Sequence, residues 1–106
     1  MDYRNKKILL MGLGGFKKGS GISSAEFLAS KGADLTITDL KDAKELSSNL
    51  QPLKKYKNIK YILGGHQETD FIETDWVVRN PDVPPSSSFL TIARTKDVPI
   101  DNDITL

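Results

Sequence analysis

The chain has 106 residues, of which 38% are hydrophobic and 27% charged, and its formal net charge is +1. This length suits one domain, residues 1–106, and the near-neutral charge argues against a nucleic-acid partner, which needs a basic face. Cysteine is absent, which excludes disulfides and thiolate chemistry and favours a reducing cytoplasm. No apolar run has the length of a membrane span and no signal peptide is recognisable. We therefore expect a monomeric, cytoplasmic protein with no membrane partner.

Strand and helix signals alternate in the first half of the chain. The apolar run Lys7–Met11 predicts a strand buried on both faces, as parallel strands are. Apolar residues at helical spacing then predict a helix with Ser20 as its N-cap and Gly32 as its stop. A second strand is predicted over Asp34–Asp39, where threonines alternate with apolar residues.

The second half continues the same alternation. A helix is predicted to begin near Asp42, which is spaced from Glu45 as in a capping box, and to run toward Leu50 until Pro52 interrupts it. The remaining predicted elements are strands at 59–63 and 76–79, a helix at 89–96 and an edge strand at 98–101. The predicted fold class is therefore α/β, a Rossmann-like three-layer domain whose parallel sheet has about five short strands.

Glycine or polar residues follow four of the predicted strands, at 12–21, 39–41, 64–66 and 80–82. Ligands of doubly wound sheets bind beyond the carboxyl ends of the strands. Agreement among four separate segments predicts that this edge of the sheet is the binding edge.

The glycine-rich segment 12–21 joins a strand to a helix, which is the context of a phosphate-binding loop. Glycines permit close approach to an anion, the helix N-terminus offers unpaired N–H groups, and Lys17 and Lys18 add positive charge. The alternative is a glycine-rich turn without a ligand. Residues 14–19 have the glycine spacing of a P-loop, but Ser20 stands where that motif needs lysine, so we expect no ATP binding here.

Two single residues have more than one interpretation. Asp39 ends the second strand, where an acid accepts hydrogen bonds from a ribose in dinucleotide folds, or from a uridine base N–H; it is equally placed to cap a helix or loop. His66 lacks the neighbouring histidines or cysteines of a zinc site and is more simply a hydrogen-bonding loop residue. No catalytic or metal-binding residues are assigned.

Several short motifs in a fixed order carry a resemblance to a known family. They are Met11-Gly12-Leu13-Gly14, Ser20-Gly21-Ile22-Ser23, Thr36-Ile37-Thr38-Asp39, Leu63-Gly64-Gly65-His66 and Arg79-Asn80-Pro81-Asp82-Val83-Pro84. Their order and spacing across nearly the whole chain resemble the opening of the D-glutamate-adding enzymes of the Mur ligase family.

That resemblance implies a domain that binds the UDP moiety of UDP-N-acetylmuramoyl-L-alanine for an ATP-dependent, amide-bond-forming ligase of peptidoglycan synthesis. The remaining ligase domains, in cis, would bind ATP and Mg²⁺, so this chain alone is expected to be inactive and to hold no cofactor. The diphosphate would lie at the glycine-rich segment and uracil at the second strand end. The implied UDP-binding residues are Gly14, Gly15, Ser20, Gly21, Asp39, Leu40, Asn80 and Asp82.

The chain departs from the family pattern in two places. Its glycine-rich segment is about four residues longer than the usual GLGxSG form, and Asp82 stands where the family has glycine, near a site for an anion. Two other functions stay open. One is an NAD(H)-binding Rossmann module of a dehydrogenase or regulatory domain, and the other is an interaction domain without a nucleotide.

Overall fold

Five parallel strands form one sheet in the order β3-β2-β1-β4-β5. The computed structural model describes residues 2–13, 20–80, 83 and 86–102. The strands are β1 Lys7–Met11, β2 Asp34–Asp39, β3 Ile59–Leu63, β4 Trp76–Arg79 and β5 Ile100–Asn102. The chain adds β2 and β3 on one side of β1 and then returns to add β4 and β5 on the other. This reversal creates a switch point between β1 and β4, and the predicted α/β parallel sheet is confirmed.

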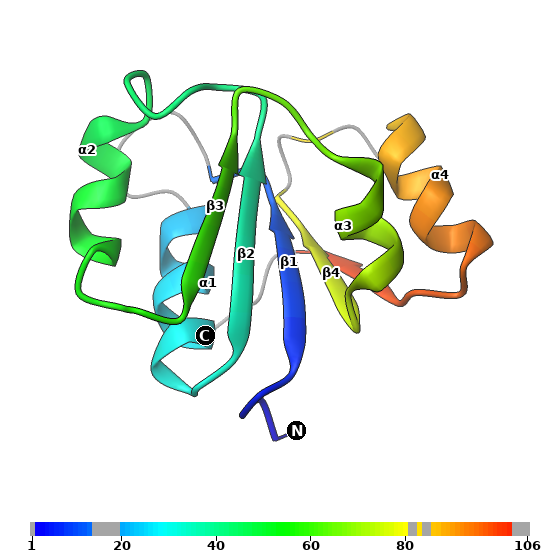
Figure 1. Cartoon of the computed structure of the whole chain (residues 1–106), viewed down its shortest axis with the longest axis horizontal. Helices are drawn as coiled ribbons and strands as arrows, with labels where there is room; N and C mark the ends of the chain where they lie inside the picture. The colour runs from blue at the N-terminus through cyan, green and yellow to red at the C-terminus, as the bar shows by residue number, and fades with distance from the viewer. Residues whose placement is uncertain (1, 14–19, 81–82, 84–85, 103–106) are drawn as a thin grey trace.

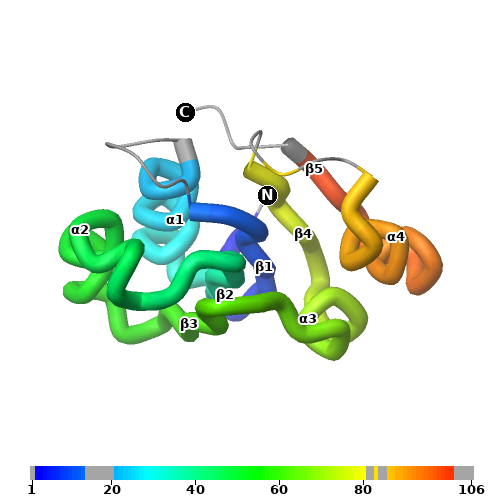
Figure 2. Tube along the Cα trace, turned by 90° about the horizontal axis from the view of Figure 1, so that it is seen from above, coloured from blue at the N-terminus to red at the C-terminus, as the bar shows by residue number. Residues whose placement is uncertain are grey.

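Helices cover both faces of the sheet, which makes three layers. They are α1 Ser20–Ser30, α2 Ser47–Leu50 with the 3₁₀ turn η1 Gln51–Leu53, α3 Glu68–Glu73 and α4 Ser88–Thr95. α1 and α2 lie on one side of the sheet, while α3 and α4 lie on the other (Figures 1 and 2). None of the described helices is long and apolar enough to cross a membrane.

The two faces of β1 build two separate cores. Ile8 and Leu10 pack with Leu28 of α1, whereas Leu9 and Met11 pack with Phe71 of α3. Because successive side chains of a strand point to opposite faces, a strand covered on both sides must be apolar throughout. This explains why Lys7–Met11 was recognisable in the sequence. Phe71 and Trp76, whose size and apolar surface predict core positions, are both buried.

Helix α1 ends at Ser30, and Gly32 follows it as the predicted left-handed stop. The N–H of Gly32 donates to the carbonyl of Ala29, the N–H of Ala33 donates to the carbonyl of Leu28, and Gly32 has φ +85°. This pair of hydrogen bonds is the Schellman motif, which needs a left-handed residue. At its other end α1 includes Ser20 as its first residue, so Ser20 is not the preceding cap residue.

Two predicted boundaries in the second half were wrong, and one helix was not predicted. Asp42 and Glu45 do exchange the hydrogen bonds of a capping box, yet the α-helix begins only at Ser47, after a run of turns. α3 was not predicted, because in six residues it buries only Phe71 and shows no apolar periodicity. The edge strand β5 covers Ile100–Asn102 instead of 98–101.

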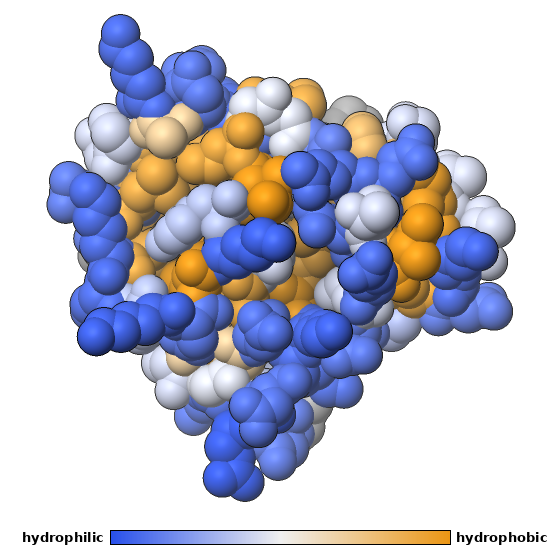
Figure 3. Space-filling model, viewed as in Figure 1, coloured by the Kyte–Doolittle hydropathy of each residue, from blue (hydrophilic) through white to orange (hydrophobic). Residues whose placement is uncertain are grey.

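The face of the sheet that carries α3 and α4 is only partly covered by helices (Figure 1). In Figure 1, β2 and β3 stand in front with no helix before them, while α3 and α4 lie beside β1 and β4. In the same view, Figure 3 shows hydrophobic surface in the middle of the molecule, crossed by hydrophilic side chains. Lys60 on β3 is exposed, and Ile62, two residues along the same face, is half-buried.

Candidate functional site

The carboxyl ends of β1, β2 and β4 meet around Gly12 and Leu13. Gly12 leaves β1 with φ +89°, and its N–H donates to the carbonyl of Thr38 on β2 at 2.8 Å. A Cβ at Gly12 would lie 2.9 Å from Val83 and 3.0 Å from Cβ of Asn80. Glycine is needed here for both its left-handed conformation and the close approach of the segment after β4.

Asp39 connects the end of β2 to the start of the glycine-rich segment. Its Oδ2 accepts the N–H of Leu13 and its Oδ1 accepts the N–H of Lys41, each at 2.9 Å. The N–H of Gly65 donates to the Asp39 carbonyl at 3.1 Å. Asp39 therefore organises three of the four segments that were predicted to form the binding edge.

Asn80 and Gly21 lie together on the α1 side of the same edge. Asn80 is only 3% exposed, and its N–H donates to the carbonyl of Met11 at 2.9 Å. A Cβ on Gly21 would overlap the Leu13 carbonyl and lie 2.9 Å from Nδ2 of Asn80. Glycine at position 21 thus lets the first turn of α1 pack directly on the end of β1.

Leu40 is the most exposed large apolar side chain that the structure describes, with 71% of its surface accessible. It follows Asp39 directly, so an apolar side chain stands in solvent beside the buried end of β2. Exposed apolar side chains are common singly, but this one lies at the edge where the polar site residues converge.

The structure brings together Gly21, Asp39, Leu40 and Asn80 of the predicted UDP-binding residues. Gly14, Gly15 and Asp82 lie outside the described residues, as do Lys17 and Lys18. Ser20 is described as the first residue of α1, but its side chain is not described.

His66 was predicted to be a hydrogen-bonding loop residue, and its contacts confirm this. Nδ1 lies 2.7 Å from Oγ1 of Thr38. The ring packs edge-to-face on Phe71 and Phe89, with centroids 6.0 Å and 5.1 Å away. Burial lowers the pKa of His66 below its ordinary value, and the Asp39 carboxylate acts in the opposite direction.

The partners of His66 were missed by the sequence analysis. The sequence pattern identifies Thr38 only as a β-branched strand residue and Phe89 only as a helix residue. The alternation of side chains between the two faces of β2 could have indicated a partner for Thr38. Thr36 and Thr38 lie on the face opposite Leu35 and Ile37, so a polar partner was needed for a buried hydroxyl on that face.

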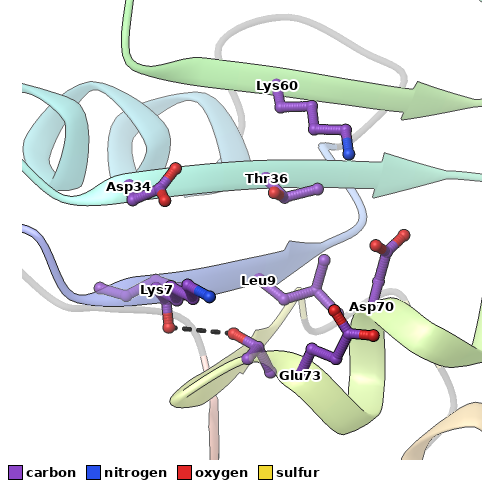
Figure 4. Close-up of a pocket in the computed structure, with 9 residues that line it drawn as sticks. Lys7, Leu9, Asp34, Thr36, Lys60, Asp70 and Glu73 are labelled. Atoms are coloured by element: carbon purple, nitrogen blue, oxygen red, sulfur yellow. Dashed lines mark hydrogen bonds between the residues drawn. The ribbon is translucent and has the colours of Figure 1, made fainter.

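A cavity lined by side chains lies away from this edge. It has a volume of about 200 Å³ and is lined by Lys7, Ile8, Leu9, Asp34, Thr36, Lys60, Asp70, Glu73 and Thr74. Figure 4 shows the side chains of Lys60 and Asp70 reaching toward the same end of the cavity, with Glu73 beside Asp70. Ligand pockets are usually about 300–1,000 Å³, so this cavity is small for a nucleotide.

The carboxylate of Asp70 in that cavity is affected by burial and by the charges of Lys60 and Glu73. Its Oδ2 is buried and has no hydrogen-bond partner in the described part of the chain. Burial raises the pKa of Asp70 above its usual range, the Lys60 ammonium lowers it and the Glu73 carboxylate raises it. No group of three or more His, Cys, Asp or Glu within the described ranges is arranged to hold a metal ion.

Known proteins resemble this chain over nearly its whole length. Residues 6–101 match the family model of the Mur ligase MurD-like N-terminal domain. The UDP-N-acetylmuramoylalanine--D-glutamate ligase of Roseiflexus sp. (strain RS-1) is 42% identical over 100% of this chain and 22% of that protein. The enzyme of the same name from Borreliella burgdorferi (strain ZS7) is 39% identical over 99% of this chain and 22% of its own length. The chain therefore spans about a fifth of the length of these relatives.

Solved structures agree with the sequence relatives. A pseudomurein peptide ligase type C from Methanothermus fervidus superimposes with a TM-score of 0.69 and 25% identity, over 92% of this chain and 19% of that one. The UDP-N-acetylmuramate-alanine ligase MurC from Thermotoga maritima gives a TM-score of 0.65 and 26% identity, over 92% and 20%. Since the family model matches nearly the whole chain, the chain belongs to the family of MurD-like N-terminal domains of Mur ligases.

Proposed function

We propose that this chain binds the UDP moiety of UDP-N-acetylmuramoyl-L-alanine, as the first domain of an ATP-dependent D-glutamate-adding ligase of peptidoglycan synthesis. Residues 1–106 would form the substrate-binding domain, and further domains in cis would complete the enzyme. The observation that carries the proposal is the convergence of Asp39, Asn80 and the first turn of α1 around Leu13.

The first turn of α1 suits the diphosphate. The first N–H groups of a helix have no partner within the helix, and its dipole places positive potential there. Gly21 has no side chain, so the backbone of this turn packs directly against the end of β1. An anion that reaches the glycine-rich segment would meet these N–H groups, as phosphates do at comparable strand-to-helix turns.

Asp39 and Leu40 suit uracil. Both carboxylate oxygens of Asp39 accept one backbone N–H, but each oxygen of an ionised carboxylate has a second lone pair. One of these can accept the N3–H of uracil while the backbone hydrogen bonds stay in place. The exposed side chain of Leu40 would then supply an apolar surface for the flat ring.

Neither the sequence of the glycine-rich segment nor the described residues suit ATP and Mg²⁺. Ser20 occupies the position at which a P-loop requires lysine, and the described residues hold no metal-ligand cluster. We therefore propose that other domains bind ATP and Mg²⁺, and that this chain contributes substrate binding without catalysis. The 106-residue chain should release no phosphate from ATP in the presence of Mg²⁺.

The base specificity of the 106-residue chain tests the proposal. Cytosine lacks the N3 hydrogen and presents a lone pair there, so wild-type protein should bind UDP more tightly than CDP. A charge-assisted hydrogen bond contributes ~1.5–3 kcal/mol, so the preference should be roughly tenfold or more. Asp39→Asn should lose most of it, because its amide can also donate to cytosine N3. Asp34→Asn, on the same strand but at its exposed amino end, is the control and should keep the preference.

Titration with NAD separates this proposal from the dinucleotide alternative. In an NAD site the Asp39 carboxylate would accept from the adenosine ribose, so NAD would bind at least as tightly as UDP. Calorimetry would measure the affinities of UDP and NAD, and amide chemical shifts near Gly21, Asp39 and Asn80 would show where each ligand binds. NAD displacing UDP, or equal binding of UDP and CDP, would refute the proposal.

A further inference from the structure

His66 lies where three elements meet beside the proposed nucleotide site. Its Nδ1 is 2.7 Å from Oγ1 of Thr38 on β2. Its ring packs against Phe71 of α3 and, more closely, against Phe89 in the first turn of α4. One side chain therefore touches the strand that leads into Asp39 and both helices on that face of the sheet.

The hydroxyl of Thr38 depends on this histidine. Thr38 is completely buried, and its Oγ1 has two described partners, Nδ1 of His66 at 2.7 Å and the carbonyl of Gly65 at 3.5 Å. A separation of 3.5 Å is at the limit of hydrogen bonding. The Thr38 hydroxyl therefore donates its proton to Nδ1 of His66. The imidazole then carries its own proton on Nε2.

The segment fixed by this contact contains the proposed uracil residues. Main-chain hydrogen bonds already join the turn before His66 to the segment that contains Asp39. The N–H of Gly65 donates to the carbonyl of Asp39, and the N–H of Gly64 donates to the carbonyl of Lys41. The bond between Thr38 and His66 adds a side-chain tie one residue before Asp39. Phe89, which packs against the same ring, belongs to the helix that follows the Asn80 segment.

We propose that His66 is a positioning residue for nucleotide recognition, which holds Thr38, and through it Asp39, in register with the helix that follows Asn80. The inference rests on the proposed function. His66 touches neither the base nor the diphosphate in this role; it sets the direction of the Asp39 carboxylate. The consequence is that removal of the Thr38–His66 bond should reduce discrimination between uracil and cytosine, beyond any general loss of stability.

Three variants separate the hydrogen bond from the ring packing. Thr38→Val removes the donor at nearly constant shape, and His66→Phe keeps an aromatic ring but removes the acceptor. His66→Asn loses the ring but can place an amide oxygen near the position of Nδ1. Thr36→Val, on the same face of β2 but beside the separate cavity, is the matched control.

We expect Thr38→Val and His66→Phe each to weaken UDP binding roughly three- to tenfold and to narrow the UDP over CDP preference. The double variant should be no weaker than the worse single variant, because both remove the same bond. His66→Asn should recover the preference for UDP even if its melting temperature stays low. Thr36→Val should bind both nucleotides as the wild type does.

Amide chemical shifts in ligand-free protein provide an independent measurement. The signals of Leu13 and Lys41, whose N–H groups bond to Asp39, should move in His66→Phe and Thr38→Val but stay in place in Thr36→Val. Unchanged Leu13 and Lys41 signals, an unchanged UDP over CDP preference or additive losses in the double variant would overturn the positioning role. A wild-type chain that fails to bind UDP would instead refute the proposed function, while the shifts would still report on the contact.

Discussion

The Asp39 carboxylate accepts the backbone N–H of Leu13 at 2.9 Å, across 26 positions of sequence. This bond fixes where the chain turns as it leaves β1, because Leu13 is fully buried and its N–H has no access to water. Asp39 thus has a structural role that exists before any ligand arrives. Its effects on folding and on binding must be measured separately.

Asp39→Ala should lower the free energy of unfolding. It removes the acceptor of Leu13 N–H and of Lys41 N–H, and a buried donor left unpaired costs about 1–3 kcal/mol. Chemical denaturation at neutral pH would measure this loss. Asp34→Ala at the exposed end of the same strand should change stability far less. Equal stability of Asp39→Ala and wild type would show that the Leu13 bond contributes nothing.

Gly21→Ala should destabilise the protein although alanine is the better helix former. Helix propensity alone would stabilise the variant by about 1 kcal/mol, whereas the added Cβ would overlap the Leu13 carbonyl. Overpacking against backbone costs about 1–3 kcal/mol or more, so Gly21→Ala should have a lower free energy of unfolding than the wild type. Ser23→Ala, exposed on the same helix, should be neutral or stabilising. A melting temperature of Gly21→Ala at or above that of the wild type would contradict the close packing of α1 on β1.

Gly32→Ala should destabilise the protein by about 1–2 kcal/mol, because a left-handed residue with a Cβ is strained by that amount. Gly32 has φ +85°, and a Cβ there would also lie 3.1 Å from Cγ of Arg4. Gly32→Asn should cost less, since asparagine tolerates the left-handed conformation. Thermal unfolding of the two variants provides the comparison. If alanine and asparagine were equally tolerated, the end of α1 would not need this conformation.

Asp70→Asn should stabilise the protein at neutral pH, and the gain should fade as the pH falls. Burial raises the folded-state pKa of Asp70 above its usual range, with Lys60 opposing and Glu73 adding to the rise. An acid with a raised folded pKa binds its proton more tightly when folded, so the charged form costs stability above that pKa and nothing below the unfolded value. Neutral asparagine removes the cost only where Asp70 is charged.

Melting temperatures of Asp70→Asn and wild type between acidic and neutral pH would measure this difference. Asp34→Asn, on the wall of the same cavity, controls for the removal of one negative charge. A variant that is less stable than wild type at neutral pH would show that attraction to Lys60 outweighs the burial of the carboxylate.

Local sequence patterns predicted β1 to β4 at their observed boundaries. These strands are apolar or β-branched runs of four to six residues, and each is followed by glycine, a loop segment or Asn80. In β1 and β4, burial on both faces excludes polar side chains from most positions. In β2 and β3, β-branched and aromatic residues favour a strand, and the glycine that follows β3 ends the pairing. The placement of Gly21, Asp39 and Asn80 at one edge followed from the parallel arrangement alone.

Other features could not be predicted because they depend on packing between distant segments. α3 is a helix because Phe71 fills the second core, and nothing in its six residues shows that periodicity locally. The region after Asp42 has the hydrogen bonds of a capping box, but tertiary context delays the α-helix to Ser47. Short segments form few hydrogen bonds of their own, so their conformation follows the surface they cover.

The sequence by itself determined the α/β class, the parallel strands and the family resemblance, and it predicted which edge of the sheet would bind a ligand, because each depends on residue type and local order. Only the tertiary structure decided that Asp39 binds Leu13 and that His66 binds Thr38, pairs separated by 26 and 28 positions. Hydrogen bonds between distant residues depend on strand order and on the register of β1, β2 and β3, which the crossover connections and the packing of both cores fix together.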